Sequence, residues 1–155
     1  MLSLKYQEIY SVFLSKADAY DLAEMADKEA HATMGEWLRA VKSNIRFRQM
    51  FSTLLIDDER MVVQFEIKYS QGDDETDLDF VRDLMGVGMA FKWVEPKYKS
   101  IMHTRQFFGG KEEKFFSQSN FANSVKNLYE VCKLDFINTI RDYDYMFNGY
   151  ITGDE

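Results

Sequence analysis

Cysteine, proline and histidine are scarce in this chain, whose 155 residues include one cysteine, one proline and two histidines. A single cysteine excludes an internal disulfide, and Cys132 falls within an apolar helical pattern, where a thiol acts as a small buried hydrophobic group. We therefore do not expect a reactive cysteine paired with His31 or His103. Neither histidine stands at metal-ligand spacing from Cys132. The sequence predicts no metal and no cofactor.

Long uninterrupted apolar runs are also absent. No stretch approaches the roughly 18 apolar residues of a membrane-spanning helix, and Lys5, Gln7 and Glu8 interrupt the apolar pattern at the N-terminus, unlike a signal peptide. We expect a soluble protein that is not exported by that route and has no membrane partner. A chain of this length fits one domain that buries roughly two-thirds of its unfolded surface. We predict a single domain over residues 1–155.

The motifs of common enzyme classes are missing as well. There is no G-x-S-x-G, no phosphate-binding glycine loop and no dinucleotide fingerprint. The acidic run over residues 73–79 does not fit a calcium loop, because Leu78 and Leu84 occupy the sixth and twelfth positions, where glycine and a bidentate carboxylate are needed. The consecutive acids at 57–59 point in different directions and indicate a turn. We predict a protein that is not an enzyme and has no small-molecule substrate.

Charge is present in blocks of alternating sign, within a net charge of −7. Residues 1–38, 69–91 and 115–155 are net negative, and residues 39–68 and 92–114 are net positive. Such blocks suit a protein that meets copies of itself, because a positive region of one copy can face a negative region of the next. Solvated faces without a partner are the alternative interpretation.

The most basic cluster is small. Binding of nucleic acid as the main ligand needs a concentrated basic surface, which this chain lacks. DNA is expected at most as a neighbour bound without sequence specificity. The candidate DNA-facing residues are Arg39, Lys42, Arg46 and Arg48.

Helical periodicity is the strongest positive signal. Between residues 120 and 147, eight apolar residues recur at steps of three or four, the spacing of one stripe on an α-helix. Similar patterns predict helices over residues 3–16, 19–51 and 76–94, the last ended by Pro96. For the second helix, a break near residues 31–35 is the alternative, because Thr33 and Gly35 have low helix propensity. The stripe of the closing helix consists of Phe121, Val125, Leu128, Cys132, Phe136, Ile140, Tyr143 and Phe147.

A change of period separates the second and third predicted helices. Residues 61–69 alternate between apolar and polar, as in a half-buried strand, and residues 53–56 are apolar and β-branched at two positions. Residues 57–60 between them suit a hairpin loop; a continued helix is the alternative. The predicted fold class is therefore mainly α, a helical bundle of about four helices with a small β-hairpin. The stretch 96–119, with glycines at 109 and 110, has the least regular pattern.

Short segments spread over residues 4–147 form a set with a characteristic order. They are a tyrosine-rich opening helix, residues 36–41 (EWLRAV), residues 57–59 (DDE) with a later Phe65, residues 89–96 (MAFKWVEP), a lysine–glutamate stretch with Phe116 and Ser117, and residues 141–145 (RDYDY) in a long closing helix. This order resembles that of a family of small structural proteins of tailed bacteriophages, found among head and tail genes. Each segment is short, so the resemblance depends on the set.

The resemblance implies a virion protein without catalysis, made in the cytoplasm of the bacterial host. Its expected role is that of a head-to-tail connector, or adaptor, which forms an oligomeric ring in the neck below the portal. The expected partners are copies of itself, the portal, other neck or tail proteins, and the passing DNA.

In that role, two regions would make the contacts. The edge of the predicted strand 61–69 would pair with a neighbouring chain, and residues 96–119 would be a docking loop that becomes ordered on binding. Residues 148–155 would form a flexible tail. Trp93, at the end of a helix, would anchor either a core or an interface. The candidate interface residues are Phe65, Ile67, Tyr69, Trp93, Phe107, Phe108, Phe115 and Phe116.

A different class of protein is compatible with the same features. A small cytosolic regulatory or inhibitory protein could bind one host protein through an acidic helical surface. A mass that stays that of a dimer at every concentration would favour this alternative.

Overall fold

The computed structural model describes the backbone of residues 1–17, 19–108 and 112–147, and it describes their side chains except those of residues 20, 104–108 and 112–121. These ranges contain six helices and three strands. The helices are α1 (Tyr6–Lys16), α2 (Tyr20–Ala23), α3 (Asp27–Val41), α4 (Ile45–Gln49), α5 (Asp74–Phe108) and α6 (Glu112–Met146). The strands are β1 (Leu2–Lys5), β2 (Phe51–Asp57) and β3 (Val62–Ile67).

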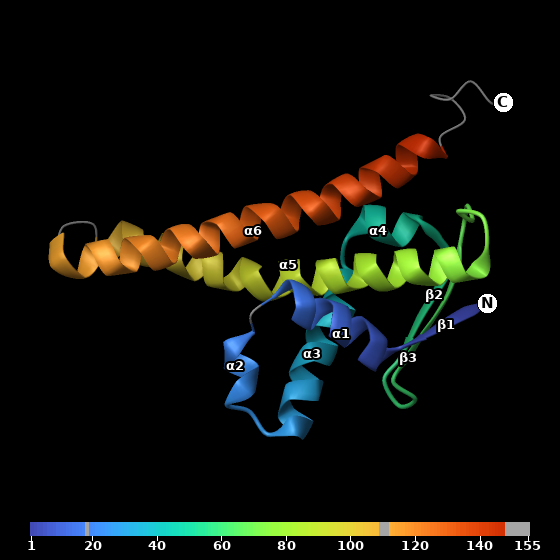
Figure 1. Cartoon of the computed structure of the whole chain (residues 1–155), viewed down its shortest axis with the longest axis horizontal. Coiled ribbons are helices and arrows are strands. Elements are labelled where there is room, and N and C mark those ends of the chain that lie inside the picture. The colour runs from blue at the N-terminus through green and yellow to red at the C-terminus, as the bar shows by residue number, and fades with distance from the viewer. Residues whose placement is uncertain (18, 109–111, 148–155) are drawn as a thin grey trace.

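Two long antiparallel helices, α5 and α6, form the axis of the molecule (Figure 1). Each has 35 residues, which corresponds to a length of about 52 Å at 1.5 Å per residue. A compact chain of this size has a radius of gyration of about 15 Å, equivalent to a sphere about 39 Å across. The α5–α6 hairpin is therefore longer than a compact body would be, and one end of it extends beyond the smaller elements.

The core lies where α1, α3, α4 and the sheet meet the middle of the long hairpin. Gly86 and Gly88 of α5 allow this approach, because a Cβ at Gly86 would lie 2.4 Å from Cγ1 of Val12, and one at Gly88 would lie 2.8 Å from Cγ1 of Val41. These two glycines therefore set the close packing of α1 and α3 on α5. The largest fully buried side chains are Ile9, Phe13, Leu38, Phe47, Met50, Phe65, Met85, Met89, Phe136 and Ile140.

The predicted bundle of about four helices with a hairpin is wrong as a fold class. The hairpin is present, as β2 and β3, but it belongs to a three-stranded antiparallel sheet of order β1-β3-β2. The first three residues of the helix predicted over 3–16 instead belong to β1, which pairs from Leu2↔Phe65 to Lys5↔Val62. A hairpin alone is marginally stable in water, and β1 stabilises it by placing Leu4 in the core.

The predicted second helix, over residues 19–51, is also wrong in its continuity. It consists of three helices, α2, α3 and α4, separated by short breaks. Asn44 explains the last break, because its side-chain oxygen accepts a hydrogen bond from the backbone N–H of Phe47 at 3.0 Å. Asparagine in this position favours the start of a new helix over continuation of the old one.

Pro96 does not end a helix, contrary to the prediction. Helix α5 continues through it to Phe108, and α6 begins at Glu112, so most of the predicted docking loop over residues 96–119 is helical. An internal proline costs a helix about 3 kcal/mol. Contacts beyond the proline favour continuation of the helix, since Lys97 pairs with Asp21 at 3.0 Å and Tyr98 stacks on Tyr129 of α6 with ring centroids 4.3 Å apart. The predicted tail over residues 148–155 lies outside the described residues.

Candidate interaction surfaces

Two of the predicted interface residues belong to the core. Phe65 is fully buried and packs edge-on against Phe51, and Trp93 is 4% exposed. The indole N–H of Trp93 donates to a carboxylate oxygen of Asp21 at 3.2 Å. Neither side chain can contact another molecule in this conformation, so the prediction of an interface role for them is wrong. The other possibility given for Trp93, a core anchor, is confirmed.

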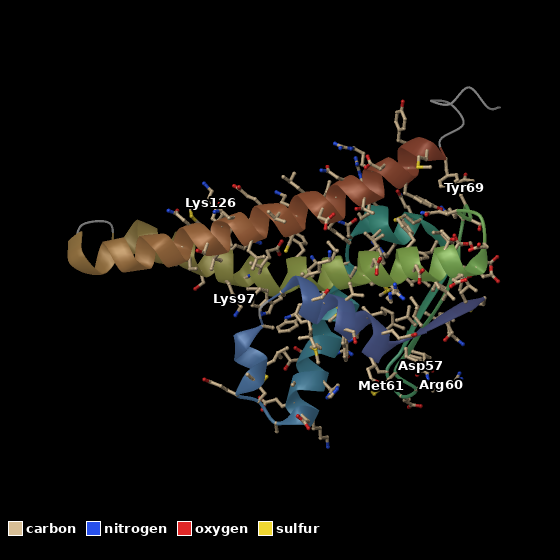
Figure 2. The ribbon with its side chains drawn as sticks, in the orientation of Figure 1. Asp57, Arg60, Met61, Tyr69, Lys97 and Lys126 are labelled. Carbon is tan, nitrogen blue, oxygen red and sulfur yellow. The ribbon has the colours of Figure 1, made fainter. Side chains whose placement is uncertain are left out.

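Tyr69 and Ile67 lie near the end of β3, close to the C-terminal end of α6. Tyr69 is half exposed, and its ring stacks on Phe147 at 5.6 Å. The hydroxyl of Tyr143 donates to the backbone oxygen of Tyr69 and accepts from its backbone nitrogen, both at 3.0 Å. Tyr69 therefore joins the sheet to α6 (Figure 2). Ile67 is half-buried.

The predicted edge of strand 61–69 is not an edge. Strand β3 is central in the sheet and pairs with β1 on one side and β2 on the other. Its backbone groups are therefore used within the chain. The predicted strand pairing with a neighbour could occur only at β1 or β2. The side chains of the remaining candidates, Phe107, Phe108, Phe115 and Phe116, lie outside the described residues.

The hairpin loop between β2 and β3 is fixed to the helices by one carboxylate. The Tyr6 hydroxyl donates to an Asp58 oxygen at 2.6 Å, and Arg39 of α3 reaches the same oxygen at 2.7 Å. These two contacts hold the pKa of Asp58 below its usual value. Burial, with the hydrogen bond to Asp58, raises the pKa of Tyr6.

The four candidate DNA-facing residues are all exposed. Arg39 is used in the ion pair with Asp58. Lys42 follows the end of α3, and Arg46 and Arg48 belong to the short helix α4. Of the four residues, Arg39 is thus engaged in an internal contact, and Lys42, Arg46 and Arg48 are exposed at the end of α3 and in α4.

Helix α4 presents an apolar side chain between these two arginines. Phe47 is fully buried against Phe136 of α6, with ring centroids 6.1 Å apart. Successive helix positions are 100° apart, so Ile45 lies opposite Phe47, with Arg46 and Arg48 on its two sides. Ile45 is 62% exposed. We call Ile45, Arg46 and Arg48 the α4 tip.

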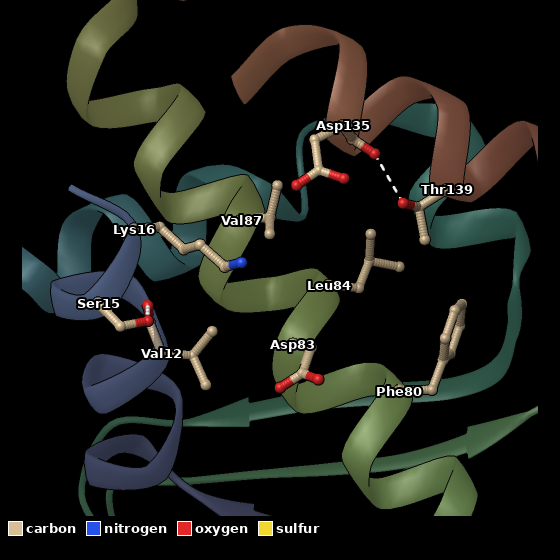
Figure 3. Close-up of a pocket in the computed structure, with 9 residues that line it drawn as sticks. All are labelled: Val12, Ser15, Lys16, Phe80, Asp83, Leu84, Val87, Asp135 and Thr139. Carbon is tan, nitrogen blue, oxygen red and sulfur yellow. Dashed lines mark hydrogen bonds between the residues drawn. The ribbon is translucent and has the colours of Figure 1, made fainter. Parts of the chain in front are cut away.

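A groove opens between α1 and α6, with α5 as its floor (Figure 3). Its volume is about 380 Å³, near the low end of the roughly 300–1,000 Å³ typical of ligand clefts. It can therefore accept a few side chains but not a whole helix. We call it the α1–α6 groove; its lining residues are Val12, Ser15, Lys16, Phe80, Asp83, Leu84, Val87, Asp135 and Thr139.

The groove combines an apolar floor with charged walls. Leu84 and Val87 form the floor, and the carboxylates of Asp83 and Asp135 lie on its two sides in Figure 3. Lys16 extends into the groove from α1. Asp83 lies 3.3 Å from Arg82, and its side chain is 60% exposed. The groove thus offers two carboxylates and one ammonium group around an apolar centre.

Cys132 lies next to this groove but is not part of it. The side chain is buried, and burial, together with the neighbouring Asp135 carboxylate, raises the pKa of the thiol. A thiol in this state is a poor nucleophile at neutral pH. Within the described ranges, no group of three or more histidine, cysteine, aspartate or glutamate side chains could hold a metal ion, and no helix could span a membrane.

The sequence did not indicate the groove or the tip. The groove brings together residues from positions 12 to 139 on three helices, and no local pattern connects them. Ile45 lies within the long helix predicted over residues 19–51, and the start of α4 after Asn44 was not predicted.

Comparison with protein-family models, with curated proteins and with solved structures gave no match.

Proposed function

We propose that this chain is a non-enzymatic structural protein of a tailed-bacteriophage virion, a head-to-tail connector that forms an oligomeric ring in the neck below the portal. The observation that carries the proposal is the α5–α6 hairpin, whose two 35-residue helices extend beyond the body of the chain. A long two-helix unit leaves its sides open, and neighbouring subunits in a ring would cover them.

The outward side of α6 supports this role. Val131 and Leu134 lie three residues apart, so they share one side of the helix, and they are 64% and 57% exposed. Single exposed apolar residues are ordinary. Two neighbours on the outer side of an extended helix instead suit lateral contact with another protein.

The resemblance to tailed-phage structural proteins supports the same role. Its segments 36–41 and 89–96 lie in α3 and α5, where Leu38, Val41 and Met89 are buried. These segments therefore define the packing of α3 on α5. They support an architecture shared with the tailed-phage proteins. The contacts between subunits would be made by other residues.

The proposed partners follow from the location in the neck. They are copies of this chain, the portal and other neck or tail proteins, with DNA passing through the ring without sequence-specific contact. The mature location is the virion, after synthesis in the cytoplasm of the bacterial host.

The proposal is tested by the mass of the purified protein over a wide range of concentrations, alone and with portal protein. A connector is expected to give species larger than a dimer, or a complex with the portal. A dimer that never enlarges under either condition would contradict the connector and favour a small regulatory protein.

A further inference from the structure

The α4 tip and the α1–α6 groove are complementary, and we propose that the tip of one copy docks in the groove of the next. The contact rests on the proposed connector function, since it specifies how one copy would bind another. The partner is thus a second copy of this chain, in a head-to-tail arrangement.

The chemistry of the two surfaces matches. The tip is an exposed isoleucine between two arginines, Arg46 and Arg48. The groove is an apolar floor with the Asp135 carboxylate on one side and, on the other, the carboxylate of Asp83, which also pairs with Arg82 at 3.3 Å. Insertion of Ile45 would bury apolar surface, while the guanidinium groups would meet the carboxylates. Arginine forms strong charge-assisted hydrogen bonds with carboxylates, often in a bidentate geometry.

The positions of the two surfaces favour a heterologous contact. Asp135 lines the groove, whereas the adjacent Phe136 packs against Phe47 of α4. The groove and the tip therefore lie on different flanks of α6, so one neighbour cannot easily fill both. Tip-to-tip or groove-to-groove pairing would bring like charges together. Head-to-tail contacts close into a ring when the rotation between copies permits.

The positive charge of Lys16 opposes docking of the arginines, and its removal provides a further test of the contact. Its ammonium group extends into the groove from α1 and has the same sign as the incoming arginines (Figure 3). Docking would require this flexible side chain to move toward solvent or toward Asp135. The Lys16→Met variant, which keeps an unbranched apolar chain and removes the charge, is therefore expected to assemble more tightly than the wild type.

The experiment uses three charge or polarity changes at exposed positions. Ile45→Asp combined with Arg48→Glu disables the tip, and Asp135→Arg disables the groove. Each change raises the concentration for half-assembly by at least about tenfold if the pairs contribute as charged interface pairs do. The control is Lys28→Glu, a charge reversal at an exposed residue near the start of α3, outside both the groove and the tip.

Mixing the variants gives the decisive readout by native mass spectrometry. The tip variant keeps its groove and the groove variant keeps its tip, so the mixture should form a 1:1 dimer and nothing larger, while each variant alone stays monomeric. The control should assemble like the wild type. Circular dichroism melting of each variant checks that the fold is retained.

Other results would contradict the docking contact or the connector function. Variants that assemble like the wild type, or a mixture that stays monomeric, overturn the docking contact and leave the connector function standing. A wild type that stays monomeric at all concentrations also overturns the contact between copies. The connector function fails separately, when the wild type neither assembles alone nor binds the portal.

Discussion

Lys97 and Asp21 are joined by an ion pair of 3.0 Å across 76 residues of sequence. The second oxygen of the same carboxylate accepts the indole N–H of Trp93, one helical turn earlier in α5. These contacts attach the short helix α2 to α5 on both sides of Pro96. They explain how α2, with four residues, keeps a defined place. Lys97 is shown in Figure 2.

The Asp21→Asn variant tests this attachment. It removes the charge that Lys97 contacts, and we expect a loss of about 1 kcal/mol in the free energy of unfolding at pH 7, because the side chains are partly exposed. Burial acts to raise the pKa of Asp21, but the hydrogen bonds from Lys97 and Trp93 outweigh it and lower the pKa. The charged form therefore stabilises the fold.

The pH dependence follows from the direction of this shift. A carboxylate with a lowered folded pKa contributes fully above its unfolded value of about 3.9, and the contribution is lost as the pH falls further. Urea unfolding at pH 7 and at pH 3 should thus show a difference between wild type and Asp21→Asn that shrinks at the lower pH. An equal difference at both values would contradict the charged attachment.

The turn between β2 and β3 contains a residue whose backbone strain can be relieved by substitution. Met61 has a φ of 54°, in the left-handed region that favours glycine, and its side chain is largely exposed. We expect Met61→Gly to stabilise the protein by about 0.5–1 kcal/mol, measured as an increased midpoint of urea unfolding. Met61→Val, which is β-branched, should lower the midpoint; a higher midpoint for valine would exclude strain as the explanation.

Gly88 tests the close approach of α3 and α6 to α5. The Cβ of Gly88→Ala would lie 2.8 Å from Val41 and 2.9 Å from Phe136, and such overpacking costs about 1–3 kcal/mol. Gly35→Ala is the matched control, because its nearest atom, the Tyr10 hydroxyl oxygen, is 3.3 Å away. The control should be neutral or stabilising, since alanine is favoured in helices. Equal destabilisation in both would show that Gly88 is not a packing position.

Hydrogen exchange tests the course of α5 beyond Pro96. The amides of Tyr98 and Ile101 should be protected, because α5 continues through them and Tyr98 stacks on Tyr129. Tyr129→Ala removes that stacked ring and should increase exchange at both amides. Exchange at unfolded rates in the wild type would show that the helix ends at the proline, as the sequence alone predicts.

Local patterns predicted the elements better than their ends. The period of two at 61–69 and the stripe of the closing helix correspond to β3 and α6, because each pattern reflects side chains that meet the same core. The predicted end of α5 was wrong because Pro96 is a local signal, whereas the helix beyond it also contacts α2 and α6. Strand β1 was missed because four residues carry little periodicity, and its formation depends on β3.

The candidate surfaces were harder to predict than the elements. Phe65 and Trp93 were selected as aromatic residues at suggestive positions, and burial places both in the core. The α1–α6 groove depends on the approach of α1 to α5 at Gly86, which is a tertiary event. Ile45, which is exposed, is the first residue of α4 and follows the Asn44 cap. Such relations between distant residues leave no periodic pattern in the sequence.

The most direct test of the proposed function is a density map of the neck of the tailed-phage particle that, on this proposal, would contain this chain. We predict one ring of identical copies below the portal, with the α5–α6 hairpin of each copy covered by protein on its sides. A particle in which the chain is absent from the neck, or present with both long helices facing solvent, would contradict the account.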